Sequence, residues 1–143
     1  MDINEFISIF KKKYKKKSKL KDYVNLLKSI KFQNWEKFIK KDEKKYFRNI
    51  LFRNDDFEII VITWMNSQKT PIHSHPENGC IMKILKGHLS EKKHYPNKNI
   101  ESFIYHKGDC SYIHNDIATH VIENISGDVS VSLHIYSPPN FYN

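Results

Sequence analysis

The 143-residue sequence contains only two cysteines, only two arginines and no long apolar run. In a reducing compartment, Cys80 and Cys110 are expected to remain thiols rather than form a disulfide. No stretch approaches the roughly 20 apolar residues of a membrane-spanning helix. The first lysine follows residues 1–10 instead of preceding an apolar segment, which reverses the order of a secretion signal. We therefore expect a cytoplasmic protein without a membrane partner.

Positive charge is confined to the N-terminal third of the chain. Residues 1–50 contain 16 Lys plus Arg against 6 Asp plus Glu, whereas the remainder contains 8 against 10. Of the 24 basic residues, 22 are lysines, which lack the planar fork that arginine uses to read bases. We do not expect a nucleic-acid partner and interpret the lysine run at 11–17 as a solvated helix face. Binding of this run to nucleic acid or to an anionic surface through counterion release is the alternative.

The period of the hydrophobic pattern changes near residue 50. Apolar residues have helical spacing in Ile3–Tyr14 and Asp22–Ile30, and Asn34 could cap a third short helix. From Phe57 the period becomes two, as in β-strands. The predicted strands are Glu58–Trp64, Cys80–Lys86, His88–Tyr95, Ile100–Tyr105, His120–Ile125 and Val129–Tyr136.

So many short strands within about 80 residues predict an antiparallel sandwich or a small barrel. We therefore expect a mainly β protein with a single domain over residues 1–143. Within it, a lysine-rich helical segment would cover residues 1–45 and a β-barrel residues 46–143.

A pair of histidines two residues apart forms the first candidate metal site. On an extended segment, His73 and His75 project to the same side and can present two imidazoles to one ion. The pair alone is a weak signal, because a chain with 8 histidines can contain such a pair by chance. His120 lies on a later predicted strand and would complete a set of three if the strands close into a barrel.

The residues around these histidines resemble the two motifs of the cupin superfamily. The first motif is matched with a cysteine where a glutamate ligand usually stands. The matching residues are His73, His75, Cys80 and Gly87 for the first motif, and Gly108, His120 and Asn124 for the second. Without that carboxylate, three neutral imidazoles leave open positions on an octahedral ion where a substrate and O₂ can both bind.

From about Trp35 to Pro139 the chain resembles the cysteine dioxygenases, which are small cupins with a three-histidine ferrous site. The markers are Tyr46-x-Arg48-Asn49, Trp64, His73-x-His75, Cys80, His120-x-x-Glu123-Asn124 and Ser132-x-His134-x-Tyr136-Ser137-Pro138-Pro139. The resemblance implies a non-haem Fe(II) dioxygenase that adds both atoms of O₂ to the sulfur of L-cysteine, giving cysteine sulfinic acid. We expect it to act as a monomer.

The resemblance also implies roles for individual residues in binding. Fe(II) would be bound by His73, His75 and His120. Arg48 would hold the substrate carboxylate, because a guanidinium grips a carboxylate at two points. Tyr46 would support Arg48 or line the pocket. The alternatives are a surface salt bridge for Arg48 and core packing for Tyr46.

Cys80, His134 and Tyr136 are the implied catalytic residues. In animal-type members the matching tyrosine and cysteine become joined by a thioether; the alternative for Cys80 is a buried small apolar residue. Ser132, His134 and Tyr136 alternate along one predicted strand, so Ser132 would orient His134, which would orient Tyr136. The Ser137-Pro138 bond is a candidate for a cis peptide.

Two alternative functions remain open. The three histidines do not discriminate between thiols with and without an amine, so another small thiol such as 3-mercaptopropionate could be the substrate. The barrel could also be a non-catalytic binding module that uses the lysine-rich segment. The sequence ends at Asn143, whereas animal members continue with strands that help cover the pocket, so we expect looser substrate selectivity.

Overall fold

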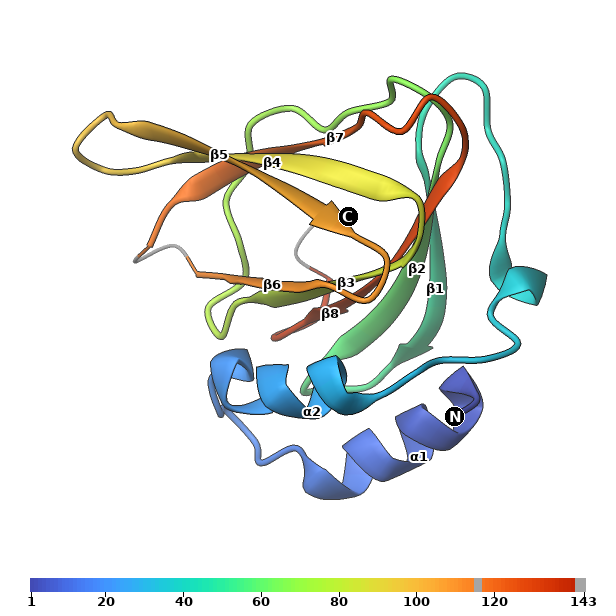
Figure 1. The fold of residues 1–143 in the computed structure, drawn as a ribbon. Coiled ribbons are helices and arrows are strands. Elements are labelled where there is room, and N and C mark those ends of the chain that lie inside the picture. The colour runs from blue at the N-terminus through green and yellow to red at the C-terminus, as the bar shows by residue number, and fades with distance from the viewer. Residues whose placement is uncertain (115–116, 141–143) are drawn as a thin grey trace.

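The computed structural model describes residues 1–114 and 117–140, so the last three residues of the chain lie outside the described part. In this part, two antiparallel sheets face each other, and helices cover the outer face of the larger one (Figure 1). The larger sheet has the order β1 (Phe47–Arg53), β2 (Glu58–Trp64), β8 (Ser130–Tyr136), β3 (Cys80–Lys86) and β6 (Cys110–Ile113). The smaller sheet has the order β5 (Ile100–His106), β4 (His88–His94) and β7 (Thr119–Asn124). The prediction of a mainly β, antiparallel fold with N-terminal helices is confirmed.

The central strands β2 and β8 are buried along their whole length. Because side chains alternate along a strand, Ile59 and Leu133 pack toward the helices, whereas Ile60 and Trp64 point into the barrel. The two hydrophobic clusters therefore lie on opposite faces of the same sheet.

The N-terminal helices are α1 (Ile3–Lys13) and α2 (Val24–Ser29), with 3₁₀ turns at Leu20–Tyr23 and Glu36–Phe38. Asp2 caps α1 by accepting a hydrogen bond of 2.6 Å from the backbone N–H of Asn4. Phe10 of α1 is fully buried and meets Phe57 edge to face, with ring centroids 4.9 Å apart. None of the helices in the described ranges is long and apolar enough to cross a bilayer.

A buried lysine attaches α2 to the sheet. The Lys83 ammonium on β3 donates a 2.6 Å hydrogen bond to the carbonyl oxygen of Leu27, in the last turn of α2. A positive charge is favourable there, because the carbonyl groups at a helix C-terminus are otherwise unsatisfied. The helices thus lie fixed against the outer face of the sheet that lines the barrel.

The prediction of a third helix capped by Asn34 is wrong. Asn34 has a left-handed φ of 58°, and only a single 3₁₀ turn follows it, starting after Trp35 without a side-chain cap. All six predicted strands are present with ends within one residue of the prediction, and the Ser137–Pro138 bond is cis as expected. The short strand β6 and the bulged strand β1 were not predicted, because neither has a clean alternation of apolar residues.

Candidate active site

The segment before β3 runs alongside β7 and brings two distant histidines together. His73 and His120 exchange two backbone hydrogen bonds of 3.1 Å, as partners in an antiparallel bridge do. Three residues earlier, the Thr70 N–H donates to the carbonyl of Ile122, and the Thr70 hydroxyl accepts from the Ile122 N–H. The His73 segment is therefore held as an extra stretch of strand at the edge of the smaller sheet.

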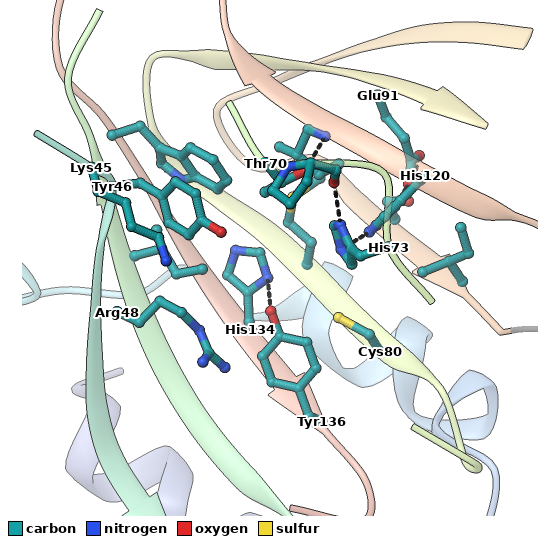
Figure 2. A pocket seen from close by; sticks show the side chains of 17 residues that line it. Lys45, Tyr46, Arg48, Thr70, His73, Cys80, Glu91, His120, His134 and Tyr136 are labelled. Carbon is teal, nitrogen blue, oxygen red and sulfur yellow. Dashed lines mark hydrogen bonds and ion pairs between the residues drawn. The ribbon is translucent and has the colours of Figure 1, made fainter. Parts of the chain in front are cut away.

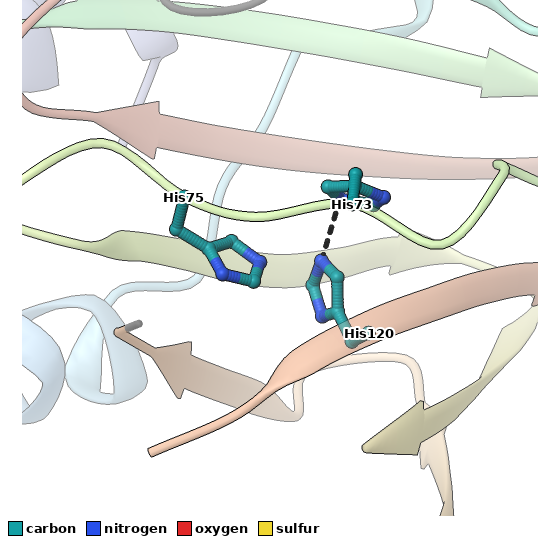
Figure 3. A group of neighbouring side chains, drawn as sticks. All are labelled: His73, His75 and His120. Atoms are coloured by element: carbon teal, nitrogen blue, oxygen red, sulfur yellow. Dashed lines mark hydrogen bonds between the residues drawn. The ribbon is translucent and has the colours of Figure 1, made fainter. Parts of the chain in front are cut away.

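This pairing assembles the three-histidine set. One ring nitrogen from each of His73, His75 and His120 lies within 4.8 Å of the other two (Figure 3). His75 and His120 are buried, and His73 is partly exposed. The sequence-based prediction that His120 lies beside the His73–His75 pair is therefore met by the geometry.

The hydrogen bonds of the rings define which nitrogens face the centre of the cluster. Burial and the nearby His120 lower the pKa of His73 to about 4, so its ring is neutral, and its Nδ1 lies 2.9 Å from the Pro71 carbonyl oxygen. A carbonyl only accepts, so this Nδ1 carries the proton and Nε2 carries a lone pair. The Nδ1 of His120 lies 2.6 Å from the carboxylate of Glu91, which can only accept, so this Nδ1 also carries a proton and donates it in a hydrogen bond.

The two Nε2 atoms of His73 and His120 face each other at 2.8 Å. At this distance the two nitrogens need a proton or a cation between or beside them. Three imidazoles that each offer a ring nitrogen are also a donor set that suits iron, zinc, copper or nickel. The cluster therefore fits a divalent transition metal ion.

Glu91 on β4 belongs to the site and was not predicted. Its carboxylate is fully buried and accepts hydrogen bonds from His120 at 2.6 Å, Tyr105 at 2.9 Å and Ser111 at 3.0 Å. Burial acts to raise the pKa of Glu91, but the hydrogen bond from His120 and nearby positive charge hold it below its ordinary value. The sequence did contain a signal, because Glu91 shares a strand face with the buried Leu89.

A cavity of about 280 Å³ opens beside the histidines and is large enough for a small thiol. Figure 2 shows the side chains around it, with Arg48 and Tyr136 near one another and His73 and His120 across the cavity. All three implied catalytic residues, both implied substrate-binding residues, and two of the three implied metal ligands, His73 and His120, line this cavity, whereas His75 is not among the lining residues. The structure thus brings the predicted site residues together.

Arg48 and Tyr46 enter the cavity from the start of β1. The Arg48 guanidinium carbon lies 5.6 Å from the centre of the Tyr136 ring, and its side chain is 20% exposed. Tyr46 stacks on the indole of Trp64 with centroids 4.7 Å apart. Tyr46 thus lines the pocket and also packs against the core, which are two of the three arrangements considered from the sequence.

A hydrogen-bonded chain runs along the inner face of β8. The indole N–H of Trp64 donates a hydrogen bond of 2.9 Å to the hydroxyl of Ser132. This hydroxyl lies 2.6 Å from Nε2 of His134. Nδ1 of His134 lies 3.2 Å from the hydroxyl of Tyr136. The predicted order of Ser132, His134 and Tyr136 is present, with Trp64 as an additional member. Burial, together with the charge of Arg48, lowers the pKa of His134 well below its ordinary value.

Cys80 lies directly opposite Tyr136 in the register of β3 and β8. Its side chain is buried, and burial raises the pKa of the thiol, so the sulfur is protonated near neutral pH. Both residues line the cavity. The thiol is therefore positioned beside the phenol, on the side of the sheet that faces the histidines.

The end of β8 is also connected to the N-terminal segment. The Ser137 hydroxyl donates a hydrogen bond of 2.7 Å to the carbonyl oxygen of Asp56 and accepts one of 3.0 Å from the side-chain amide of Asn78. The hydroxyl of Tyr14, the residue that ends α1, lies 2.6 Å from the same Ser137 oxygen. The turn that follows Tyr136 is thus fixed from three directions.

The chain is similar in sequence to known proteins of one family. A family model for cysteine dioxygenase type I matches residues 3–142. Cysteine dioxygenase type 1 of Danio rerio is 33% identical over 117 residues, which cover 75% of this chain and 58% of that protein. The Rattus norvegicus protein of the same name is 32% identical over 114 residues, which cover 73% of this chain and 57% of that protein. The chain thus spans less than two thirds of the length of these relatives.

The fold is also similar to solved structures. A cupin 2 conserved barrel domain protein from Leptotrichia buccalis matches with a TM-score of 0.60 and 17% identity, over 73% of this chain and 47% of that chain. This likeness confirms the predicted cupin fold.

Proposed function

Because the chain belongs to the cysteine dioxygenase type I family, we propose that it is a thiol dioxygenase that converts L-cysteine and O₂ into cysteine sulfinic acid. One observation carries the proposal: a group of three imidazoles lies beside a cavity of the size of a small amino acid, and the guanidinium of Arg48 lines the same cavity. The reaction adds both oxygen atoms to the sulfur of the thiol. One thiol and one O₂ therefore give one sulfinic acid, and no added reductant is needed.

We propose that Fe(II) is held by His73, His75 and His120. When bound, the ferrous ion would supply open positions for the thiolate and for O₂, together with the redox chemistry that joins them. Glu91 accepts a hydrogen bond from the Nδ1–H of His120 and would so keep Nε2 of that ring directed at the metal position. Pro71 does the same for His73 through its carbonyl group.

Arg48 would hold the carboxylate of the substrate. Its guanidinium offers parallel donors that match both carboxylate oxygens, whereas the neighbouring Lys45 offers a point charge. Binding at this end of the cavity would place the thiol of a two-carbon chain toward the histidines. The arginine thus selects thiols that carry a carboxylate.

Tyr136 would donate its proton into the cavity. Trp64 can only donate to Ser132, so the Ser132 hydroxyl proton is available for Nε2 of His134. In that tautomer Nδ1–H of His134 donates to the oxygen of Tyr136, which leaves the phenol's own proton for Cys80 or for the substrate in the cavity. The chain of donors fixes the phenol before substrate arrives, which is the preorganisation that favours developing negative charge on oxygen or sulfur.

We propose that Cys80 and Tyr136 can become joined by a thioether, supported by their direct cross-strand position. The bond would form with loss of the thiol hydrogen and one ring hydrogen, and O₂ would accept the two electrons. Cys80→Ser should then collapse a doublet on a denaturing gel to one band, whereas the control Cys110→Ser should leave the doublet unchanged. A gel pattern that is the same in wild type, Cys80→Ser and Tyr136→Phe would contradict the proposal.

The proposed activity is tested by O₂ uptake of the iron-loaded protein, with the sulfinate product followed by mass. L-Cysteine is compared with 3-mercaptopropionate, which lacks the amine, and with cysteamine, which lacks the carboxylate. Stoichiometric sulfinate from L-cysteine at the lowest KM would support the proposal. A preference for 3-mercaptopropionate would move the assignment to another carboxylated thiol, and no uptake with any of the three would overturn it.

We further propose that residues 1–143 act as one domain in this reaction. The support is that α1 and α2 pack against the sheet whose other face lines the cavity. The lysines at 11–13 and 15–17 are exposed, which agrees with a solvated surface.

A further inference from the structure

A second arginine lies close to the substrate-binding arginine, and a buried carboxylate stands between them. Arg53 is at the end of β1, and Glu58, at the start of β2, is its direct cross-strand partner. The Glu58 side chain is fully buried. Nε and a terminal nitrogen of Arg53 each lie 2.6 Å from the same Glu58 oxygen, Oε2.

The other oxygen of this carboxylate is the one nearer to Arg48. Oε1 of Glu58 lies 4.0 Å from a terminal nitrogen of Arg48, beyond the range of a hydrogen bond. Glu58 is therefore bound tightly by Arg53 and only loosely by Arg48. The chain has no other arginine.

A β-bulge puts both arginines on the cavity side of the sheet. Residues 48 and 53 are an odd number of positions apart, so in a regular strand their side chains would point to opposite faces. The register of β1 against β2 shifts between Ile50 and Phe52, which reverses the alternation. Arg48 pairs with Ile62 and Arg53 with Glu58, and these two β2 residues share a face.

The arrangement matters because a buried carboxylate is costly unless it is paired. If Arg53 were absent, Arg48 would be the arginine nearest to Glu58, and a movement of about 1 Å would bring it into hydrogen-bond range. The N–H groups of Arg48 would then donate hydrogen bonds to Glu58 rather than to a substrate carboxylate.

We propose that Arg53 is a specificity-determining residue: it occupies Glu58 and thereby keeps the fork of Arg48 directed at the carboxylate of the substrate. The inference rests on the proposed function, since it assigns the substrate class of the same cavity as carboxylated thiols. Arg53 is a positioning residue, because it acts through Glu58 and Arg48.

The test compares the kinetics of Arg53→Gln, Arg53→Lys and the double variant Arg53→Gln/Glu58→Gln with the wild type. Arg53→Gln should raise the KM for L-cysteine roughly tenfold, the size of one charge-assisted hydrogen bond, with little change in kcat. The KM for cysteamine should not change, because cysteamine has no carboxylate. Lys12→Gln, which removes one exposed positive charge from α1, is the matched control and should behave as wild type.

The double variant separates this role from simple support of the fold. Glutamine at position 58 has no charge to attract Arg48, so the double variant should recover most of the wild-type KM. Arg53→Lys should give an intermediate KM, since an ammonium can pair with Glu58 at only one point. These two variants also keep the test decisive if Arg53→Gln does not fold.

The outcomes distinguish failure of the proposed role of Arg53 from failure of the proposed dioxygenase activity. An active wild type with an unchanged KM in Arg53→Gln, or an equal rise for cysteamine and L-cysteine, would overturn the role of Arg53 alone. A double variant whose KM stays as high as that of Arg53→Gln would do the same. A wild type that takes up no O₂ with any thiol would overturn the proposed function and the inference together.

Discussion

The two faces of strand β8 differ completely in chemistry although every residue of the strand is buried. The face toward the helices carries Val131, Leu133 and Ile135, and the face toward the cavity carries Ser130, Ser132, His134 and Tyr136. A shift of register by one residue would exchange these faces. The comparison shows that one strand can separate stability from chemistry, and each face can be tested alone.

The strongest test of the apolar face is removal of a ring from the helix side. Phe10→Ala should lower the free energy of unfolding by about 3–5 kcal/mol, because it deletes a fully buried aromatic side chain. Urea denaturation measures the change, with Lys12→Gln as the surface control. The metal affinity of the folded variant should stay unchanged. A large loss of affinity would show that the two faces are not separate.

The complementary test removes a proposed ligand on the cavity side. His120→Ala should weaken metal binding by more than about a hundredfold, since losing even an outer partner of a ligand costs roughly 10–100-fold. A competition titration with a coloured chelator measures the affinity. His106→Ala, an exposed histidine on β5, is the control and should bind metal normally. Full metal content in His120→Ala would mean that another residue is the third ligand.

A smaller effect is expected for the carboxylate behind that ligand. Glu91→Gln keeps a carbonyl that can accept from His120 but removes the negative charge, so the metal affinity should fall about tenfold. The same chelator titration applies. If Glu91→Gln and the wild type bind metal equally, the charge of Glu91 does not support the ligand.

The smallest effect is a pH dependence that arises on the polar face of β8. His134 is buried with a lowered pKa, so below its ordinary pKa near 6.5 the unfolded chain takes up a proton that the folded chain does not. Its contribution to stability is therefore present above pH 6.5 and lost as the pH falls. Between pH 7 and 6 the loss should be about 0.7 kcal/mol. Urea unfolding of metal-free His134→Gln should lack this part of the pH dependence; an identical slope in both proteins would contradict it.

Much of the difference between the two faces of β8 could be predicted from the alternation of apolar and polar residues in the sequence. The pattern of β8 already places Ser132, His134 and Tyr136 on one side, and the structure shows the hydrogen bonds between them. Local pattern is sufficient here because a strand fixes the direction of each side chain with respect to its neighbours. The proximity of His73 to His120 needed the family resemblance, since it depends on a pairing between segments far apart in the sequence.

The residues that the sequence analysis missed are those whose role depends on a cross-strand partner. Glu91 and Glu58 are charged residues in strands, a residue type that is usually exposed, so residue type outweighed the position of Glu91 on the same strand face as Leu89. Their burial is tolerated because His120 and Arg53, respectively, donate hydrogen bonds to them. The face of Arg53 also depends on the bulge in β1, which no local pattern indicated. The prediction of a helix cap at Asn34 was wrong for a different reason: asparagine, which often caps helices, also adopts the left-handed conformation seen here.

The bridge between His73 and His120 has a consequence for the order of folding. Its two histidines are 47 residues apart in the chain, and the strands β3 to β6 must form between them. Contacts of such separation form late, because the intervening loop must first be closed at an entropic cost. The metal site would then be among the last parts of the barrel to form, so a metal ion would select chains that have already folded rather than nucleate their collapse.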